Sequence, residues 1–129
     1  MLDEFMAQFY QAISFGPGEP FPAERFRALF RSDVLLLERT DAGYISKATD
    51  EHIQEFETAM RDYPELFAEG FTERQTSLEW TEQNGVYLVH SGYEKRYIRG
   101  GEPVTECGVN HFTILIDGGT PRIACAVWE

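Results

Sequence analysis

The segment "ECGVNHF" at residues 106–112 contains three side-chain types that thiol proteases use, at Cys107, Asn110 and His111. Its position in a stretch of alternating residues predicts a β-strand, in which successive side chains point to opposite faces. Cys107 and His111 then share a face but lie roughly 13 Å apart, whereas a thiolate–imidazole pair needs about 2.6–3.2 Å. We therefore expect no Cys–His dyad here, and we expect Cys107 to be a small buried residue. Asn110 points to the opposite face.

The segment belongs to a predicted four-stranded antiparallel meander over residues 71–129. Its strands are separated by three turn signals, Asn84-Gly85, Gly100-Gly101 and Asp117-Gly118-Gly119. A two-residue loop fixes which residues lie opposite one another, and Asn-Gly is a strong signal for such a loop. In the resulting register, a mixture of aromatic and polar side chains lies on the face toward the helices, namely Trp80, Ser91, Tyr93, Asn110 and Phe112.

Asn110 on that inner face indicates a pocket. A buried amide without partners costs about 1–3 kcal/mol, so Asn110 needs hydrogen bonds. Ligand pockets typically combine apolar walls with a few placed polar groups. Two interpretations stay open: a polar network of Ser91, Tyr93 and Asn110 that satisfies itself, or a cavity that binds a small, largely apolar molecule.

The outer face carries Glu79, His90 and His111 in a row across three strands. Two histidines and a carboxylate can ligate a metal, but a polar row on a solvated or dimer-facing sheet is the interpretation we favour. We predict no metal and no other cofactor. In the last strand, Ile123, Cys125 and Val127 are predicted to face inward, and Ala124, Ala126 and Trp128 outward.

The first half of the chain is predicted to be mainly helical. An apolar stripe at helical spacing covers residues 2–15, and "GPGEPFP" ends this helix. The next elements are expected in the following order: a second helix from Pro22 that carries Phe26, Leu29 and Phe30, a strand at 33–40, a turn at 41–43, and a third helix capped by Thr49. Helices followed by a meander predict an α+β domain with the helices on one sheet face.

Length and charge limit the classes of function. The 129 residues predict a single domain over 1–129. The formal net charge of -11 disfavours nucleic acid and anionic membrane surfaces as partners. Asp3 and Glu4 stand where a signal peptide would carry basic residues, so we expect a cytoplasmic protein.

Several segments together resemble the nuclear transport factor 2-like superfamily, and within it the SnoaL-like and ketosteroid-isomerase-like proteins of bacteria. These segments are "GFTERQ", "VHSGYEKR", "CGVNHF" and "RIACAVWE". The resemblance implies a cone-shaped α+β barrel, in which three N-terminal helices pack on a curved, mainly antiparallel sheet around a pocket. It also implies a homodimer through the outer sheet face, which would cover Leu88, Val109, Ala126 and Trp128.

The resemblance also implies candidate site residues. Ketosteroid isomerases use an aspartate base with a tyrosine and a protonated aspartate as hydrogen-bond donors. By this resemblance, Tyr93 or Tyr10 would supply the phenol, and Asn110 occupies the position expected for the second hydrogen-bond donor. Glu38 or Asp41 is the candidate base. An inward His–Asp pair of the dehydratase type is not expected, because both sheet histidines face outward. The predicted ligand-binding residues are Asn110, Ser91, Tyr93, Trp80, Phe112 and Tyr10.

The sequence thus predicts a small-molecule-binding domain. Cofactor-independent acid–base catalysis of the isomerase, dehydratase or hydrolase type is one form of this function, with Tyr93 as donor. A noncatalytic dimerisation or interaction module is the alternative.

Overall fold

A curved six-stranded sheet and three helices make up the computed structural model, which describes residues 1–129. The elements are α1 (Leu2–Ala12), α2 (Ala23–Arg27), β1 (Phe30–Thr40), β2 (Gly43–Lys47), α3 (Thr49–Asp62), the 3-10 helix η1 (Pro64–Phe67), β3 (Thr72–Gln83), β4 (Val86–Arg99), β5 (Glu102–Asp117) and β6 (Thr120–Trp128). The predicted α+β class and the helices packed on a curved sheet are confirmed. None of the helices combines the length and the apolar composition needed to cross a bilayer.

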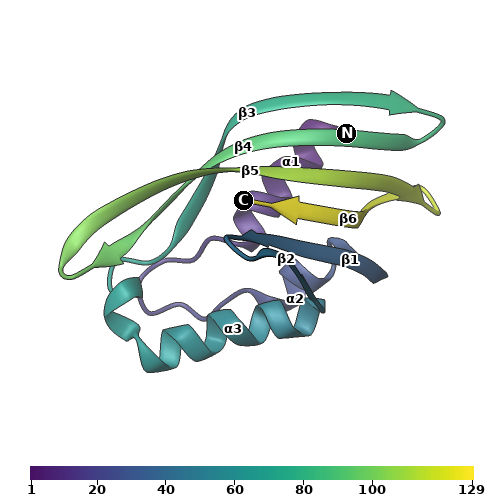
Figure 1. Ribbon diagram of the computed structural model, residues 1–129. Coiled ribbons are helices and arrows are strands. Elements are labelled where there is room, and N and C mark those ends of the chain that lie inside the picture. Colours follow the sequence, from purple (N-terminus) through teal and green to yellow (C-terminus); the bar gives the residue numbers. More distant parts are fainter.

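The strands follow the order β2-β1-β6-β5-β4-β3, and every pairing is antiparallel except that of β1 with β6. Figure 1 shows α1 behind the middle of the sheet, while α3 runs below it and the far ends of β4 and β5 bend down toward α3. The predicted meander β3–β6 is confirmed. Strand β2 was not predicted, because its residues are mostly exposed and carry no alternating pattern.

The helices follow their apolar stripes, with small differences at their ends. The stripe of α1 is buried from Leu2 to Ala12. Helix α2 ends at Arg27, so Phe30, expected in this helix, is the first residue of β1. Thr49 is the first residue of α3 and not its cap, because the Glu51 carboxylate accepts the backbone N–H of Ala48 at 3.1 Å.

The core lies between α1 and the middle of the sheet. Met6 of α1, Ile114 of β5 and Ile123 of β6 are fully buried there. Phe9 packs its ring edge against Phe112, with the ring centroids 5.0 Å apart. This core fixes α1 over the middle of the sheet and leaves the bent ends of β4 and β5 to α3 and η1 (Figure 1).

The first two hairpins have the predicted loops, and the β4–β5 register is the predicted one throughout. Strand β3 pairs as expected from Ser77 to Gln83, but a bulge at Thr76 inserts one extra residue. Beyond a bulge the faces of a strand exchange. Glu73, expected outside and opposite Arg96, therefore lies opposite Lys95 and turns inward.

A second bulge lies in β6, where Ile114 pairs with Ile123 but Thr113 pairs with Cys125. Ile123 faces inward as predicted. The prediction for the rest of the strand is wrong, since Ala126 and Trp128 face the interior, while Cys125 and Val127 face outward. The extra residue, Ala124, absorbs the change of face.

Trp80 and Cys107 also differ from expectation. Trp80 keeps its predicted pairing with Val89, but the residue is 50% exposed, and its ring packs at a tilt against the ring of Tyr87. The reason is that α1 contacts β3 near residues 72–75, and Trp80 lies beyond the end of this contact. Cys107 lies on the outer face opposite Glu94 and is exposed, not buried.

Candidate functional site

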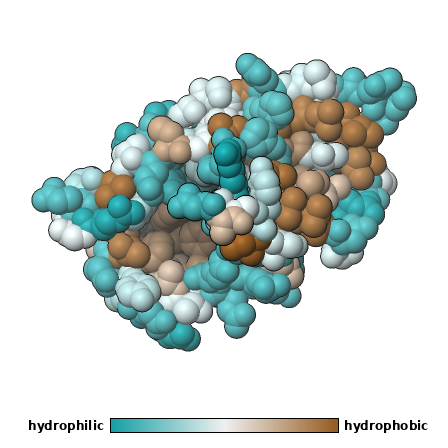
Figure 2. Space-filling view, in the orientation of Figure 1, coloured by the Kyte–Doolittle hydropathy of each residue, from teal (hydrophilic) through white to brown (hydrophobic).

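A cavity of about 410 Å³ lies between the concave sheet face and helix α3. Fifteen of its 23 lining residues are hydrophobic. Figure 2 shows the hollow above α3, with a brown floor inside a mainly hydrophilic rim. Pockets of this size and composition commonly hold small organic molecules with a few polar groups.

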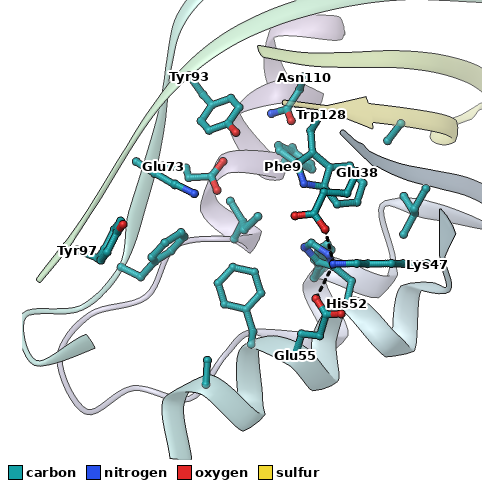
Figure 3. Close-up of a pocket in the computed structure, with 18 of the residues that line it drawn as sticks. Phe9, Glu38, Lys47, His52, Glu55, Glu73, Tyr93, Tyr97, Asn110 and Trp128 are labelled. Atoms are coloured by element: carbon teal, nitrogen blue, oxygen red, sulfur yellow. Dashed lines mark hydrogen bonds and ion pairs between the residues drawn. The ribbon is translucent and has the colours of Figure 1, made fainter. Parts of the chain in front are cut away.

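Glu73 brings a carboxyl group into this cavity from β3 (Figure 3). Burial raises the pKa of Glu73 to about 7, and the charge of Lys95 on the neighbouring strand only partly offsets this effect. No side chain of the protein forms a hydrogen bond with the carboxyl group. A carboxyl group with this pKa can both take up and release a proton near neutral pH.

Tyr93 lies on β4 beside Glu73, and Figure 3 shows its hydroxyl pointing into the same space as the Glu73 carboxyl. Burial, followed by the nearby charge of Glu73, raises the pKa of Tyr93 above its usual range, so the phenol stays protonated. The hydroxyl donates to the main-chain oxygen of Glu129 at 3.2 Å. The ring fits because residue 108, directly opposite, is glycine.

Asn110 forms part of the cavity wall and is the end of a buried hydrogen-bond network. Its Nδ2 donates to Tyr10 Oη at 3.1 Å, and Tyr10 Oη lies 2.7 Å from Ser91 Oγ. Ser91 Oγ in turn donates to Gln75 Oε1 at 2.7 Å. The network satisfies Tyr10 and Ser91, whereas the Oδ1 atom of Asn110 accepts no hydrogen bond from the protein.

Only half of the six predicted ligand-binding residues line the cavity. Tyr93, Asn110 and Phe112 line the cavity. Tyr10 and Ser91 lie behind the wall and hold Asn110 in place. Trp80 lies away from the cavity, on the exposed end of β3.

A second polar group lies at the α3 side of the cavity. The ammonium of Lys47, whose side chain is 11% exposed, contacts Glu38 at 2.6 Å and Glu55 at 2.7 Å. Burial alone would lower the pKa of Lys47, but hydrogen bonds to Glu38 and Glu55 outweigh it and the pKa is raised. Of the two predicted bases, Glu38 is therefore held in an ion pair. Asp41 lies in the exposed turn before β2, outside the cavity.

His52 of α3 is the inward histidine that the sequence analysis did not consider. Burial and, to a lesser extent, the charge of Lys47 together lower the pKa of His52 to about 4, so the ring is neutral. Its Nδ1 atom is buried without a hydrogen-bond partner. The ring packs edge-on against Trp128, with the centroids 5.2 Å apart.

The sequence held different signals for these unpredicted residues. His52 shares a helical face with Phe56 and Ala59, at the i, i+4, i+7 spacing that marks the inner side of α3. Glu73 and Trp128 had no such signal, because each was assigned to the outer face by strict alternation and a bulge reversed it.

On the outer face, Glu79 pairs with His90 and His90 with His111, as predicted. The two imidazole rings lie 4.8 Å apart, centroid to centroid. The three residues do not form a cluster that could hold a metal ion.

No family model matches the sequence, and no curated protein is significantly similar to it. Solved structures are similar over nearly the whole chain. The β subunit of benzoate 1,2-dioxygenase from Burkholderia mallei has a TM-score of 0.76 at 12% identity, covering 98% of this chain and 86% of that one. A candidate scytalone dehydratase from Novosphingobium aromaticivorans has a TM-score of 0.74 at 12% identity, covering 99% and 80%. An NTF2-like protein of unknown function from Pseudomonas putida has a TM-score of 0.70 at 12% identity, covering 99% and 82%.

The fold is therefore the NTF2-like fold, also described as cystatin-like, and the predicted resemblance is confirmed at this level. The matched proteins include an oxygenase subunit, a candidate dehydratase and a protein of unknown function. A fold that hosts such different proteins does not define one activity, so function has to be argued from the cavity.

Proposed function

We propose that this chain is a small-molecule-binding domain, similar to SnoaL-like and ketosteroid-isomerase-like proteins, in which Glu73 transfers protons to and from the bound molecule. The observation that carries the proposal is the carboxyl group of Glu73, with its pKa raised to about 7 inside a largely apolar cavity. A pKa near the working pH is the optimum for a general base or acid.

The other polar groups of the cavity suit the same reaction. As Glu73 removes a proton from a carbon of the ligand, negative charge develops on a conjugated oxygen. Two hydrogen-bond donors lie on the wall of the same cavity (Figure 3). The amide of Asn110 is held in place by its bond to Tyr10 and keeps a second N–H free. The protonated phenol of Tyr93 can turn its hydrogen bond from the main-chain oxygen of Glu129 to the ligand. Donors fixed before the reaction stabilise such charge without reorganisation. Glu73 then returns the proton to another atom of the ligand.

The base-catalysed ring opening of 5-nitrobenzisoxazole tests the proposal, because it needs only a carboxylate in an apolar pocket. We expect turnover that rises with pH and levels off above about pH 7, as Glu73 loses its proton. Glu73→Gln should lower kcat/KM by about 100-fold or more, the usual contribution of a general base.

Glu79→Gln is the matched control, since Glu79 lies on the same strand but on the outer face. It should leave kcat/KM unchanged. Equal rates for the wild type and Glu73→Gln would reject Glu73 as the base.

We also propose a homodimer through the outer sheet face. Apolar side chains that are partly or largely exposed gather on this face, at Leu35, Leu37, Leu88, Val109, Leu115 and Val127. Figure 2 shows apolar side chains over the right-hand half of the sheet. A large apolar patch on one face is typical of a protein–protein interface. Ala126 and Trp128, expected in this interface, face the interior and take no part in it.

The dimer can be tested by light scattering with two matched variants. Leu88→Glu places a charge at the outer face, where Leu88 is 54% exposed, and should convert the dimer to a monomer. Trp80→Glu changes an equally exposed residue on the opposite face and should leave the dimer intact. A stable dimer that binds no ligand would favour the noncatalytic interaction module.

A further inference from the structure

Three polar residues of β4 line one edge of the cavity: Lys95, Tyr97 and Arg99. They are spaced two residues apart, so their side chains leave the strand on the same face as Tyr93. We call these three residues the cationic rim. Figure 3 shows Tyr97 at the opposite end of the cavity from Lys47 and His52.

The two cations of the rim are weakly paired. Both approach one carboxylate, Glu106 of β5, at 3.8 Å from Lys95 and 3.9 Å from Arg99. The same Glu106 oxygen accepts the Tyr97 hydroxyl at 2.5 Å. No other carboxylate forms an ion pair with either cation, and Arg99 also donates to the Tyr97 hydroxyl. Both cations therefore keep free N–H groups for a ligand.

Two other acids lie at this end of the cavity, Glu73 opposite Lys95 and Glu102 opposite Arg99, and neither forms an ion pair with the cation opposite it. The Glu73 carboxyl group is about half protonated at neutral pH, so it carries only part of a negative charge there. The other end of the cavity has the opposite balance, because Lys47 contacts two carboxylates and His52 is neutral. The cavity thus has two loosely paired cations at the rim and an excess of negative charge at the α3 side.

This polarity contrasts with the composition of the chain, which has 22 acidic and 11 basic residues. A chain with a net charge of -11 repels anions in general, so two loosely paired cations at a cavity edge give an anion a preferred place and orientation. A guanidinium and an ammonium are together suited to a carboxylate or another oxyanion.

We propose that the ligand of this cavity is an amphipathic organic anion, with an apolar, ring-sized body and one oxyanion group held by Lys95 and Arg99. This inference rests on the proposed ligand-binding function and specifies the class of ligand. The oxyanion lies at the rim, and the apolar body extends past Glu73 over the apolar floor.

Two fluorescent probes test the inference because they share one aromatic body. 1-Anilinonaphthalene-8-sulfonate carries a sulfonate, and N-phenyl-1-naphthylamine carries none. We expect the sulfonate probe to bind more tightly to the wild type at low salt. In the double variant Lys95→Gln/Arg99→Gln, its Kd should rise by about tenfold, as expected for the loss of two partly exposed charges, while the Kd of the neutral probe changes by less than about twofold.

The control variant Arg39→Gln/Arg61→Gln removes the same charge from residues outside the cavity, and it should change neither Kd by more than about twofold. Ala59→Trp fills the cavity from α3 and should weaken both probes, which places the bound probe inside. If both probes bind in the cavity and respond alike to the double variant, the anion inference is wrong but the pocket stands. If neither probe binds, or if Ala59→Trp weakens neither, the proposed ligand-binding function fails and the inference fails with it.

Discussion

Replacing Glu73 by glutamine is expected to stabilise the protein at pH 8 by about 3 kcal/mol. Burial raises the pKa of Glu73 from the 4.5 of an ordinary glutamate in water to about 7 in the folded chain. Folding therefore has to move a charged carboxylate out of water at pH 8, and this difference in pKa corresponds to about 3 kcal/mol. The neutral amide of glutamine has a similar shape and no such cost.

The sign of the pH dependence follows from proton binding. Between pH 4.5 and about 7 the folded state binds the Glu73 proton more tightly than the unfolded state does. The free energy of unfolding of the wild type therefore loses the Glu73 contribution as the pH rises through this range. At pH 4.5 the carboxyl group is protonated in the folded state, so Glu73→Gln should gain less than about 1 kcal/mol there.

Urea unfolding of the wild type and Glu73→Gln at pH 5 and pH 8 measures this difference directly. Glu79→Gln, on the outer face of the same strand, is the control and should show no pH-dependent gain. A Glu73→Gln variant that is no more stable than the wild type at pH 8 would show that the carboxylate is well solvated in the folded state.

The same substitution should thus raise stability and lower activity. A buried, unpaired carboxylate destabilises the folded chain, and proteins retain such groups where function uses them. The ion pair of Lys47 with Glu38 and Glu55 is the contrast, because each charge there has a partner within 2.7 Å. This contrast separates Glu73 from the other acids of the cavity.

The fold could be predicted from the sequence because its signals are local. The stripe of α1, the Asn84-Gly85 turn and the Gly100-Gly101 turn each depend on a few neighbouring residues, and each is present in the structure. The two-residue loops fix the register of the strands next to them, and the register decides which face of the sheet each residue occupies. For this reason the inward positions of Ser91, Tyr93 and Asn110 could be derived from the sequence alone.

The catalytic candidate could not be derived in the same way. Between the Asn84-Gly85 turn and Glu73 lies the bulge at Thr76, and nothing in "TERQTSLEW" distinguishes a bulged strand from a regular one. One inserted residue exchanges the faces of everything beyond it. Glu73 was therefore predicted on the outer face, and the bulge in β6 had the same effect on Trp128. As a result, Glu38 and Asp41 were the only acids predicted near the pocket.

Gly108 carries the second large prediction, because it makes room for Tyr93 in the cavity wall. A Cβ atom at this position would overlap both the Tyr93 ring and the main-chain oxygen of Glu129. Gly108→Ala should therefore lower the free energy of unfolding by about 3 kcal/mol, at the upper end of the usual cost of overpacking. It should also push the Tyr93 ring into the cavity and weaken the binding of N-phenyl-1-naphthylamine.

Gly92→Ala is the matched control, since it also adds a Cβ to a glycine of the sheet. The atoms that this Cβ would meet belong to the side chains of Ser77 and Thr76, and a short side chain can rotate away. We expect its cost to be below about 1 kcal/mol.

A double-mutant cycle separates the Tyr93 ring from the other contacts of Gly108. In a Tyr93→Ala background, Gly108→Ala should cost clearly less than it does in the wild type, with a coupling of about 1–2 kcal/mol, because the ring is no longer in the way. Additive effects of the two substitutions would show that Gly108 is required for the Glu129 backbone and not for Tyr93. A measured coupling would establish the pair Tyr93–Gly108 as the element of β4 and β5 that keeps a phenol beside Glu73 and leaves the cavity open.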